Sequence, residues 1–303
     1  MHKIAMVTAG AERFPAGTVE AIKEFAEIKC KRCETPEELL KEFADYEVFW
    51  MFGPNLCLKP KALEKLPNLK ALFRSGSGLD SLPCDWAKEH GIGVYNTPGS
   101  IAECVAEHAV ALLLSYIRQI PQYNAWAKAG YEWGKVEGMD WHISHRTLGL
   151  IGYGNIARKV EKMMGGFDMK TLHYDPFAPD STGLETLLRE SDYVSVHCPL
   201  TPETKGLINA DRLKLMKKNA LLVNTSRGPV VDEEALADAL DAGTIGGAAI
   251  DVMCAEPPDV KSHLLQLPKC LVTPHIAAFS ADFEKNFWAF SVEKLREICA
   301  GLK

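Results

Sequence analysis

The chain has 303 residues, 47% of them hydrophobic and 24% charged, and a formal net charge of -6. This length exceeds what one compact core usually serves, so two domains are expected. The acidic balance argues against nucleic acid or an anionic membrane as the main partner, because such surfaces select basic patches, and it leaves a small molecule as the expected ligand.

The opening stretch MHKIAMVTAG turns polar too early for a secretory signal, and no apolar run is long enough to span a bilayer. We therefore expect a cytoplasmic protein with no membrane partner. Nine cysteines scattered through apolar segments indicate reduced thiols. Cys30 and Cys33 form a CxxC motif, but no second pair completes a zinc site, so no metal is expected.

Short apolar runs alternate with longer amphipathic stretches along the whole chain, which is typical of repeated βα units and a parallel sheet. The sequence therefore predicts the α/β class. In the first third, four strands are expected: KIAMVT, VFWMF, LKALFRS and IGVYN.

The stretch Ser100 to Pro121 predicts one helix with Ala and Leu on most of its circumference. A helix that buries only one face needs fewer apolar positions than this stretch has. Two interpretations stay open: a core helix between domains, or a helix in a subunit contact.

A second series of strands begins near Leu148, and its near-continuous apolar character suits a sheet covered on both faces. Six strands are expected in this series: TLGLIG, KTLHYD, DYVSVHC, ALLVNTS, GAAIDV and CLVTP. The terminal stretch from Asp282 is amphipathic with aromatic residues on one side, and it predicts a helix that returns to the first domain.

Gly152 and Gly154 follow an apolar strand and precede a helix, in a GxGxxA variant of the dinucleotide fingerprint with Ala157 in third place. The glycines let amides at the start of a helix approach a pyrophosphate. Asp175 ends the next strand, about twenty residues on, where a carboxylate accepts hydrogen bonds from an adenosine ribose. The pattern predicts a dinucleotide site that favours NAD over NADP.

Three further strand ends would reach the same edge of a doubly wound sheet. They carry Arg227, the acidic pair Asp251 and Glu256, and His275. Together they provide an arginine that can bind an anion, a histidine that can act as a general acid, and carboxylates that can pair with that histidine.

The order of these motifs resembles that of the D-isomer-specific 2-hydroxyacid dehydrogenases over nearly the whole chain. The motifs are RSGSGLD, NTPGSIAECVAEH, GLIGYGNIAR, HCPLTPETKGLI, NTSRGPVVDEEAL, AAIDVMCAEPP and TPHIAA. The resemblance implies a doubly wound Rossmann-type dinucleotide-binding domain at residues 98–281. It also implies a flavodoxin-like substrate (lid) domain made of residues 1–97 and 282–303. Because the chain ends soon after the terminal helix, we expect it to lack the regulatory extension of some relatives.

The resemblance further implies an NAD(H)-dependent oxidoreductase that reversibly reduces a small 2-oxo acid to the D-2-hydroxy acid, with catalytic Arg227, Glu256 and His275. The implied cofactor contacts are Gly152, Gly154, Asn155, Ile156, Asp175, His197, Pro199, Thr204, Thr225, Ser226 and Asp251. The implied substrate contacts are backbone N–H groups of Ser75, Gly76, Ser77 and Gly78. The region of residues 100–121 would help to form a homodimer.

Two other interpretations of the motifs remain. One is a binding or scaffold protein on the same fold that senses NADH, which turnover of any 2-oxo acid would separate from an enzyme. The other is a formate dehydrogenase, but that family pairs its histidine with glutamine, so Glu256 argues against it. The substrate stays open among small and larger 2-oxo acids. The stretch Met51 to Leu58, expected to line the side-chain pocket, has no basic residue, which disfavours a phosphorylated substrate.

Overall fold

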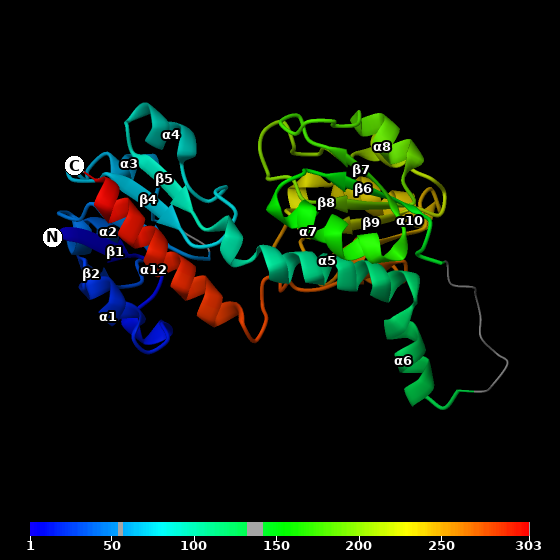
Figure 1. Cartoon of the computed structure of the whole chain (residues 1–303), viewed down its shortest axis with the longest axis horizontal. Helices are drawn as coiled ribbons and strands as arrows, with labels where there is room; N and C mark the ends of the chain where they lie inside the picture. The colour runs from blue at the N-terminus through cyan, green and yellow to red at the C-terminus, as the bar shows by residue number, and fades with distance from the viewer. Residues whose placement is uncertain (54–56, 132–141, 303) are drawn as a thin grey trace. The chain divides into compact units, whose positions relative to one another are not determined.

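The computed structural model describes residues 1–53, 57–131 and 142–302. They form two compact units, Met1–Ala102 with Phe279–Lys303, and Glu103–Ala278 (Figure 1). The domain boundaries predicted from the sequence, after residue 97 and before residue 282, lie a few residues from these. The assignment of one unit to the cofactor and the other to the substrate stays a prediction.

The first unit contains a parallel five-stranded sheet in the order β2-β1-β3-β4-β5, which is the flavodoxin-like order. The four expected strands are present, which confirms the α/β class. The strands are β1 (His2–Met6), β2 (Ala26–Cys30), β3 (Val48–Met51), β4 (Ala71–Arg74) and β5 (Gly93–Asn96).

Strand β2 was not expected from the sequence. It lies at the edge of the sheet and pairs with β1 alone. Its segment AEIKC alternates between buried and exposed positions because only one face is covered. A search for continuous apolar runs therefore misses it.

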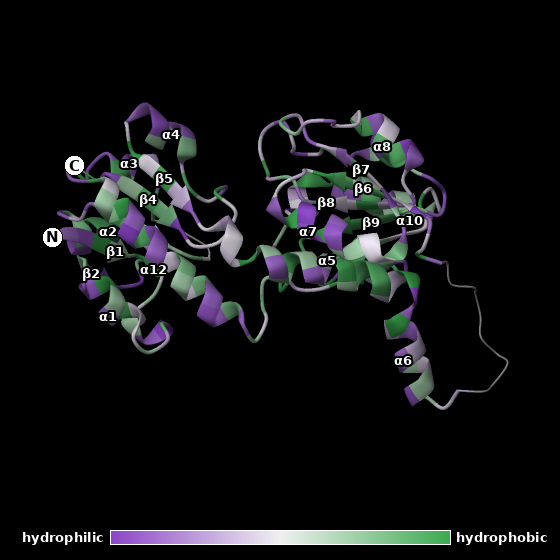
Figure 2. Ribbon diagram, in the orientation of Figure 1, coloured by the Kyte–Doolittle hydropathy of each residue, from purple (hydrophilic) through white to green (hydrophobic). Residues whose placement is uncertain are grey.

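Helices cover both faces of the first sheet. One face packs on α2 (Pro36–Phe43), α3 (Pro60–Leu63) and α4 (Cys84–Glu89), and the other on α1 (Thr18–Lys23) and α12 (Phe283–Gly301). Two short helical turns, Ala11–Arg13 and Pro98–Ser100, complete the unit. The terminal helix thus returns to the first sheet, as its aromatic stripe indicates. In Figure 2, β4 is mostly hydrophobic, whereas α12 has both polar and hydrophobic positions.

A few of the described helices begin after a residue whose side chain accepts an unpaired amide of the first turn. Thr35 Oγ1 accepts from Glu38 N at 3.2 Å ahead of α2, and Pro36 occupies the first turn, where no amide is needed. Asp232 Oδ1 accepts from Ala235 N at 3.1 Å ahead of α10 (Glu233–Asp241). These caps fix the ends of helices whose loops leave the sheets.

The second unit contains a parallel six-stranded sheet in the order β11-β10-β9-β8-β6-β7. All six expected strands are present, and the order reverses at β6 and β8, so the sheet is doubly wound as expected. The strands are β6 (Thr147–Ile151), β7 (Lys170–Tyr174), β8 (Tyr193–Val196), β9 (Leu221–Asn224), β10 (Gly247–Ile250) and β11 (Cys270–Val272).

Among the described residues, none forms a strand outside β7, where the usual dinucleotide-binding order 3-2-1-4-5-6 places its third strand. The described segment between β7 and β8 forms only a loop and α8 (Leu184–Glu190). The loop folds back on β7, because Thr182 N donates to His173 O at 2.8 Å and Pro179 O lies 3.0 Å from His173 Nε2. The loop that follows Asp175 therefore covers the outer edge of the sheet.

Helices cover both faces of the second sheet as well. One face packs on α8, α9 (Ala210–Leu213), α10 and α11 (His263–Gln266). The other face packs on α5 (Ala102–Ile117) and α7 (Asn155–Met164), with short turns at Gly165–Phe167 and Gly228–Val230. Along β8 and β9 the side chains alternate between these two layers, which explains the near-continuous apolar strands.

The single helix expected over residues 100–121 is wrong in its bounds. Helix α5 ends at Ile117, and α6 (Ile120–Lys128) begins after Gln119, whose φ of 49° is left-handed. Pro121 has no amide to donate, so it suits the first turn of α6 rather than the end of α5. One face of α5 is part of the core of the second unit, which supports the core-helix interpretation.

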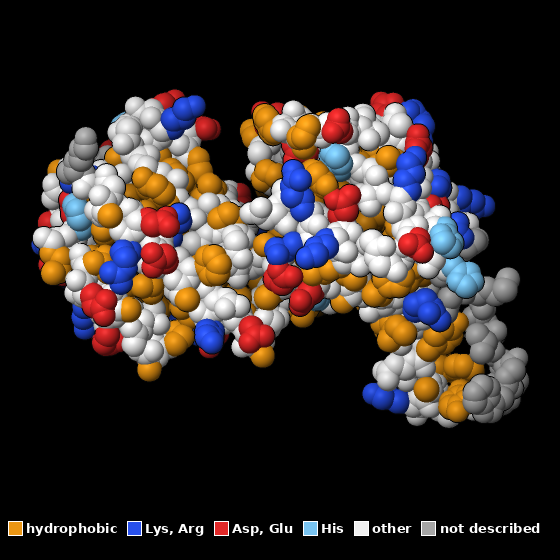
Figure 3. Space-filling view, in the orientation of Figure 1, with side chains coloured by type: hydrophobic (Ala, Val, Ile, Leu, Met, Phe, Trp, Pro, Cys, Tyr) orange, Lys and Arg blue, Asp and Glu red, His pale blue; other side chains and the backbone are white. Residues whose placement is uncertain are grey.

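On the face shown in Figure 3, lysine and arginine side chains are interspersed with aspartate and glutamate. The visible described residues therefore form no basic patch of the kind that binds nucleic-acid phosphates. None of the described helices has the length and apolar character that a membrane span requires.

A buried hydrogen-bonded chain ties α12 to the first sheet. Trp50 Nε1 donates to Ser75 Oγ at 2.8 Å, and Ser75 Oγ lies 2.7 Å from Ser291 Oγ. Ser291 Oγ also donates to Phe287 O at 2.6 Å. Because Ser291 is fully buried, it has no water to replace a lost partner.

We expect Ser291→Ala to lower the free energy of unfolding by about 1–2 kcal/mol, because Ser75 loses a buried partner. Urea unfolding followed by circular dichroism measures the change. Asn286→Ala, at an exposed position of the same helix, is the control and should leave stability nearly unchanged. Equal effects of the two substitutions would contradict a structural role for the buried chain.

Candidate active site

The turn that carries Arg227 is built by the last residue of β9. Asn224 is buried, and its Oδ1 accepts from Ser226 N at 3.0 Å and from Ser226 Oγ at 2.9 Å. Its Nδ2 donates to Arg227 O at 3.0 Å. The side chain of Asn224 thus folds the turn and sets where Arg227 begins. Sequence reasoning missed this role, although an asparagine that ends a buried strand is a known turn signal.

Gly228 lets this turn lie against the loop that follows β10. A Cβ atom at Gly228 would lie 2.1 Å from Met253 C and 2.4 Å from Cys254 N, so any side chain there would collide with backbone. The same β10 loop continues to Glu256. The glycine after Arg227 therefore allows two loops with functional residues to pack directly on each other.

His275 and Glu256, which the sequence predicts to act as an acid–base pair, are hydrogen-bonded to each other. His275 Nδ1 lies 2.6 Å from Glu256 Oε2, and Glu256 Oε1 accepts from Met253 N at 3.1 Å. The side chains of His275 and Glu256 are 47% and 38% exposed, so a substrate can reach them. With Nδ1 bonded to the carboxylate, Nε2 is the nitrogen available for proton transfer.

Asp251 fixes the backbone of the loop that carries His275. Its carbonyl oxygen accepts from His275 N at 2.7 Å, while its carboxylate accepts from Ile276 N at 3.0 Å and Ala277 N at 2.9 Å. His275 has a left-handed φ of 52°. Such a conformation costs about 1–3 kcal/mol and persists where surrounding bonds impose it. Three consecutive amides bonded to one residue provide that constraint.

The carboxylate of Asp251 is charged in this environment. Burial by itself would raise the pKa of Asp251, but hydrogen bonds from His108, Thr273 and the two loop amides keep that pKa below its usual value. The side chain has no exposed surface. Its expected contact with a nicotinamide amide stays a prediction, whereas its contacts within the protein are already established.

The glycine turn has the geometry of a phosphate-binding turn. Gly152 has a φ of 84°, and a Cβ atom there would lie 2.5 Å from Cys198 N, so only glycine fits between β6 and the end of β8. Gly154 has open space around its Cα, and α7 begins at the next residue, Asn155. The amides of this helix start, which include that of Ile156, are therefore accessible to an anion.

Asp175 lies beside the glycine turn. Its Oδ2 accepts from Tyr153 N at 2.8 Å and its Oδ1 from Phe177 N at 2.9 Å. One backbone amide on each oxygen orients the carboxylate and leaves further lone pairs for hydroxyl donors. This position is consistent with the expected contact to a ribose.

Two buried polar side chains at the carboxyl ends of the strands of the second sheet have no hydrogen-bond partner among the described residues. They are His197, through both ring nitrogens, and Thr225, through its hydroxyl. They follow the paired strands β8 and β9, and burial lowers the pKa of His197 to about 4, so its ring is neutral. Buried polar groups are normally hydrogen-bonded. These groups, with the open glycine turn, fit a bound dinucleotide.

Other expected cofactor residues use their side chains within their own turns. Thr204 Oγ1 donates to Pro199 O at 2.6 Å and accepts from Thr201 N at 2.7 Å. Ser226 is bonded to Asn224, as described above. Any contact of Pro199, Thr204 or Ser226 with a cofactor stays a prediction.

In the first unit, the loop after β4 offers fewer donors than its four residues suggest. Ser75 N donates to Met51 O at 2.9 Å, and Gly76 N donates to Thr97 Oγ1 at 2.8 Å. Within the described part of the chain, Ser77 N and Gly78 N donate no hydrogen bond. If this loop binds a carboxylate, these last two amides are the available donors.

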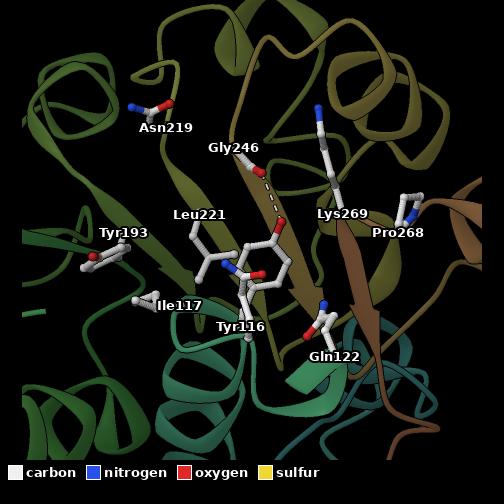
Figure 4. Close-up of a pocket in the computed structure, with 10 residues that line it drawn as sticks. Tyr116, Ile117, Gln122, Tyr193, Asn219, Leu221, Gly246, Pro268 and Lys269 are labelled. Atoms are coloured by element: carbon white, nitrogen blue, oxygen red, sulfur yellow. Dashed lines mark hydrogen bonds between the residues drawn. The ribbon is translucent and has the colours of Figure 1, made fainter. Parts of the chain in front are cut away.

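A separate hollow of about 420 Å³ lies at the opposite end of the second sheet (Figure 4). Leu221 at the start of β9 and Gly246 just before β10 line it, and Tyr116 of α5 donates to Gly246 O at 3.0 Å. Lys269 is its one charged lining residue among those described. Its described lining contains no histidine–carboxylate pair like that of His275 and Glu256.

Known proteins share this arrangement. The sequence model described as D-isomer specific 2-hydroxyacid dehydrogenase, NAD binding domain, matches residues 110–277, more than half of the chain. The chain belongs to this family. A hydroxypyruvate reductase of Thermotoga maritima is 37% identical over 281 residues, which are 90% of this chain and 91% of that protein. The crystal structure of a D-lactate dehydrogenase from Aquifex aeolicus with NAD and lactic acid has a TM-score of 0.86 and 29% identity, with 98% and 96% of the two chains covered.

Some family members are longer than this chain. The D-3-phosphoglycerate dehydrogenase 2 of Arabidopsis thaliana is 32% identical over 301 residues, which are 96% of this chain but 48% of that protein. The chain thus spans about half the length of such relatives. Membership in the family establishes a two-domain fold with an NAD-binding Rossmann domain, and NAD is the cofactor.

We expect NADH to be preferred over NADPH by roughly a hundredfold, or about 2–3 kcal/mol, because Asp175 accepts ribose hydroxyls but repels a 2′-phosphate. Steady-state kinetics with both cofactors on one substrate measure this ratio. Asp175→Asn is the matched variant, because its amide oxygen can still accept from Tyr153 N while the charge is lost. It should reduce the preference for NADH over NADPH. Equal efficiency of the two cofactors with the unchanged protein would show that Asp175 does not face the ribose.

Proposed function

We propose that the protein is an NAD(H)-dependent enzyme that reversibly reduces a small 2-oxo acid to the D-2-hydroxy acid. The observation that carries this proposal is the hydrogen-bonded pair of His275 and Glu256 at the sheet edge where the glycine turn and Arg227 also lie. A bound nicotinamide supplies the hydride in such a reaction. The remaining tasks, which are anion binding and proton transfer, belong to side chains of this chain.

Arg227 binds the substrate carboxylate in this proposal. Its planar guanidinium can donate two parallel hydrogen bonds to a carboxylate, and it remains charged at any working pH. The Asn224 turn and the Gly228 contact fix the backbone from which this side chain extends. A guanidinium held in one position would orient the 2-oxo group of the substrate relative to His275.

His275 transfers the proton. In reduction, its protonated ring donates Nε2–H to the oxygen of the developing alkoxide, and in oxidation the neutral ring accepts that proton. Glu256 accepts from Nδ1 and stabilises the protonated ring by its charge. The left-handed backbone at His275 positions the ring for this role.

The substrate class is a 2-oxo acid without a phosphate group. The support is the stretch Met51 to Leu58, which has no basic residue; residues 54–56 lie outside the described residues. An assay panel with NADH, followed by the loss of absorbance, would compare glyoxylate, hydroxypyruvate, pyruvate and larger branched or aromatic 2-oxo acids. No turnover of any of them would favour the NADH-sensing binding protein.

We further propose a cytoplasmic homodimer that forms through the region of residues 100–121. The support is the apolar character of this region on more than one face, together with the resemblance of its motif to the family. Light scattering on the purified chain measures the mass, and a monomer at micromolar concentration would contradict the dimer.

We expect Arg227→Lys to keep the fold and cofactor binding but to lower kcat/KM by about 2–4 kcal/mol of transition-state stabilisation. The reason is that lysine cannot form the two-pronged contact. Cofactor fluorescence titration and steady-state kinetics test the two parts. Arg189→Lys, on the exposed surface of α8, is the control. Unchanged kcat/KM in Arg227→Lys would remove Arg227 from the mechanism.

The two directions of the reaction should respond oppositely to pH. Reduction needs a protonated His275 and should fail as the pH rises, whereas oxidation needs the neutral ring and should fail as the pH falls. Glu256→Gln keeps an acceptor for Nδ1 but removes the charge, so reduction should slow by about tenfold. Profiles of kcat/KM in both directions measure this. Parallel profiles in the two directions would exclude His275 as the proton donor.

A further inference from the structure

A partly buried polar cluster lies beside the His275 loop, and neither the sequence motifs nor the proposed mechanism explains all of it. It joins His108 of α5, Asp251 after β10 and Thr273 after β11. His108 Nε2 lies 3.0 Å from Thr273 Oγ1 and 3.5 Å from Asp251 Oδ1. Thr273 Oγ1 donates to Asp251 Oδ1 at 2.5 Å. All three residues belong to the second unit.

The direction of these hydrogen bonds can be deduced. A hydroxyl has one proton, and that of Thr273 is donated to the carboxylate of Asp251. Thr273 Oγ1 can therefore only accept from His108, so Nε2 of His108 carries a proton. Asp251 Oδ1 lies 3.5 Å from the same nitrogen. His108 is thus the outermost donor in a chain that ends on the carboxylate.

The carboxylate of Asp251 connects this chain to the loop with His275. Its Oδ1 accepts hydrogen bonds from Thr273 Oγ1 and Ile276 N, and its Oδ2 accepts one from Ala277 N. The side chain can rotate about two bonds, and the donors on both oxygens fix its orientation. Loss of His108 would remove the donor to Thr273 Oγ1 and the N–H group nearest to Asp251 Oδ1, so the Thr273 hydroxyl and the carboxylate would be held less firmly.

We propose that His108 is a positioning residue for His275, acting through Thr273 and Asp251. The inference rests on the proposed function for its kinetic readout, because it assigns His275 the proton transfer. A ring displaced by about 1 Å can lower the rate of a positioned reaction by up to about a hundredfold. His108 lies on a helix that begins at the boundary between the two units, so the positioning originates outside the catalytic loop itself.

The kinetic experiment compares His108→Leu with His108→Gln. Leucine fills the space without a donor, whereas the glutamine amide can place an N–H near the position of Nε2. We expect His108→Leu to lower kcat for reduction by about tenfold to a hundredfold. His108→Gln should recover most of the loss. A deuterium isotope effect with labelled NADH confirms that kcat reports the hydride step.

Tyr116→Phe provides the matched control. It removes another hydrogen bond of α5, that to Gly246 O, at the end of the strands away from His275. Both substitutions remove one bond between α5 and the second sheet, so a merely structural role would give them similar, small effects on kcat. Wild-type kcat in His108→Leu, or equal losses in the leucine and glutamine variants, would overturn the proposal. Should His108→Leu not fold, His108→Asn replaces it, because its amide is too short to reach Thr273.

A spectroscopic experiment separates this inference from the proposed function. In nitrogen-15 spectra of the unchanged protein, the ring of His108 should be protonated at Nε2. In His108→Leu the amide signals of Ile276 and Ala277 should shift, while those near Gly246 should not. These outcomes are independent of turnover, so a protein that reduces no 2-oxo acid could still confirm the positioning. Unshifted amides at 276 and 277 would refute it.

Discussion

All strands of the second sheet run in the same direction, and this constraint determines where its chemistry can lie. Every loop that leaves a strand end emerges at one edge, so residues far apart in the sequence become neighbours there. The edge brings together the glycine turn after β6, Asp175 after β7, Arg227 after β9, Glu256 after β10 and His275 after β11. The hollow at the other edge has no comparable set of groups.

Direction alone does not give the loops their geometry. Asn224, Gly228 and Asp251 provide it, each by a different physical means. An amide side chain folds a turn, a missing Cβ allows backbone to touch backbone, and a buried carboxylate binds consecutive amides. None of these residues needs to contact a substrate in order to decide where Arg227 and His275 lie. The site is therefore as much a property of loop packing as of its reactive side chains.

The sequence predicts most of the second unit because its strands are apolar on both faces and its motifs follow strand ends. It fails where the signal is weak: β2 alternates like a surface segment, and the break at Gln119 depends on one left-handed residue. The pairing of His275 with Glu256 was predictable from motif order. The engagement of the Ser75 and Gly76 amides was not, because it depends on Met51 and Thr97, which are distant in the chain.

The loop after β7 has a consequence beyond cofactor binding. A parallel sheet that ends in an unpaired strand exposes a row of amides and carbonyls to which another molecule's strand can add. Here the segment after Asp175 turns back and occupies one position of that row, where Thr182 N donates to His173 O. In place of an outer strand, the sheet has the loop that begins at Asp175. Deleting this loop would remove that bond and leave more of the β7 edge open to pairing with another strand.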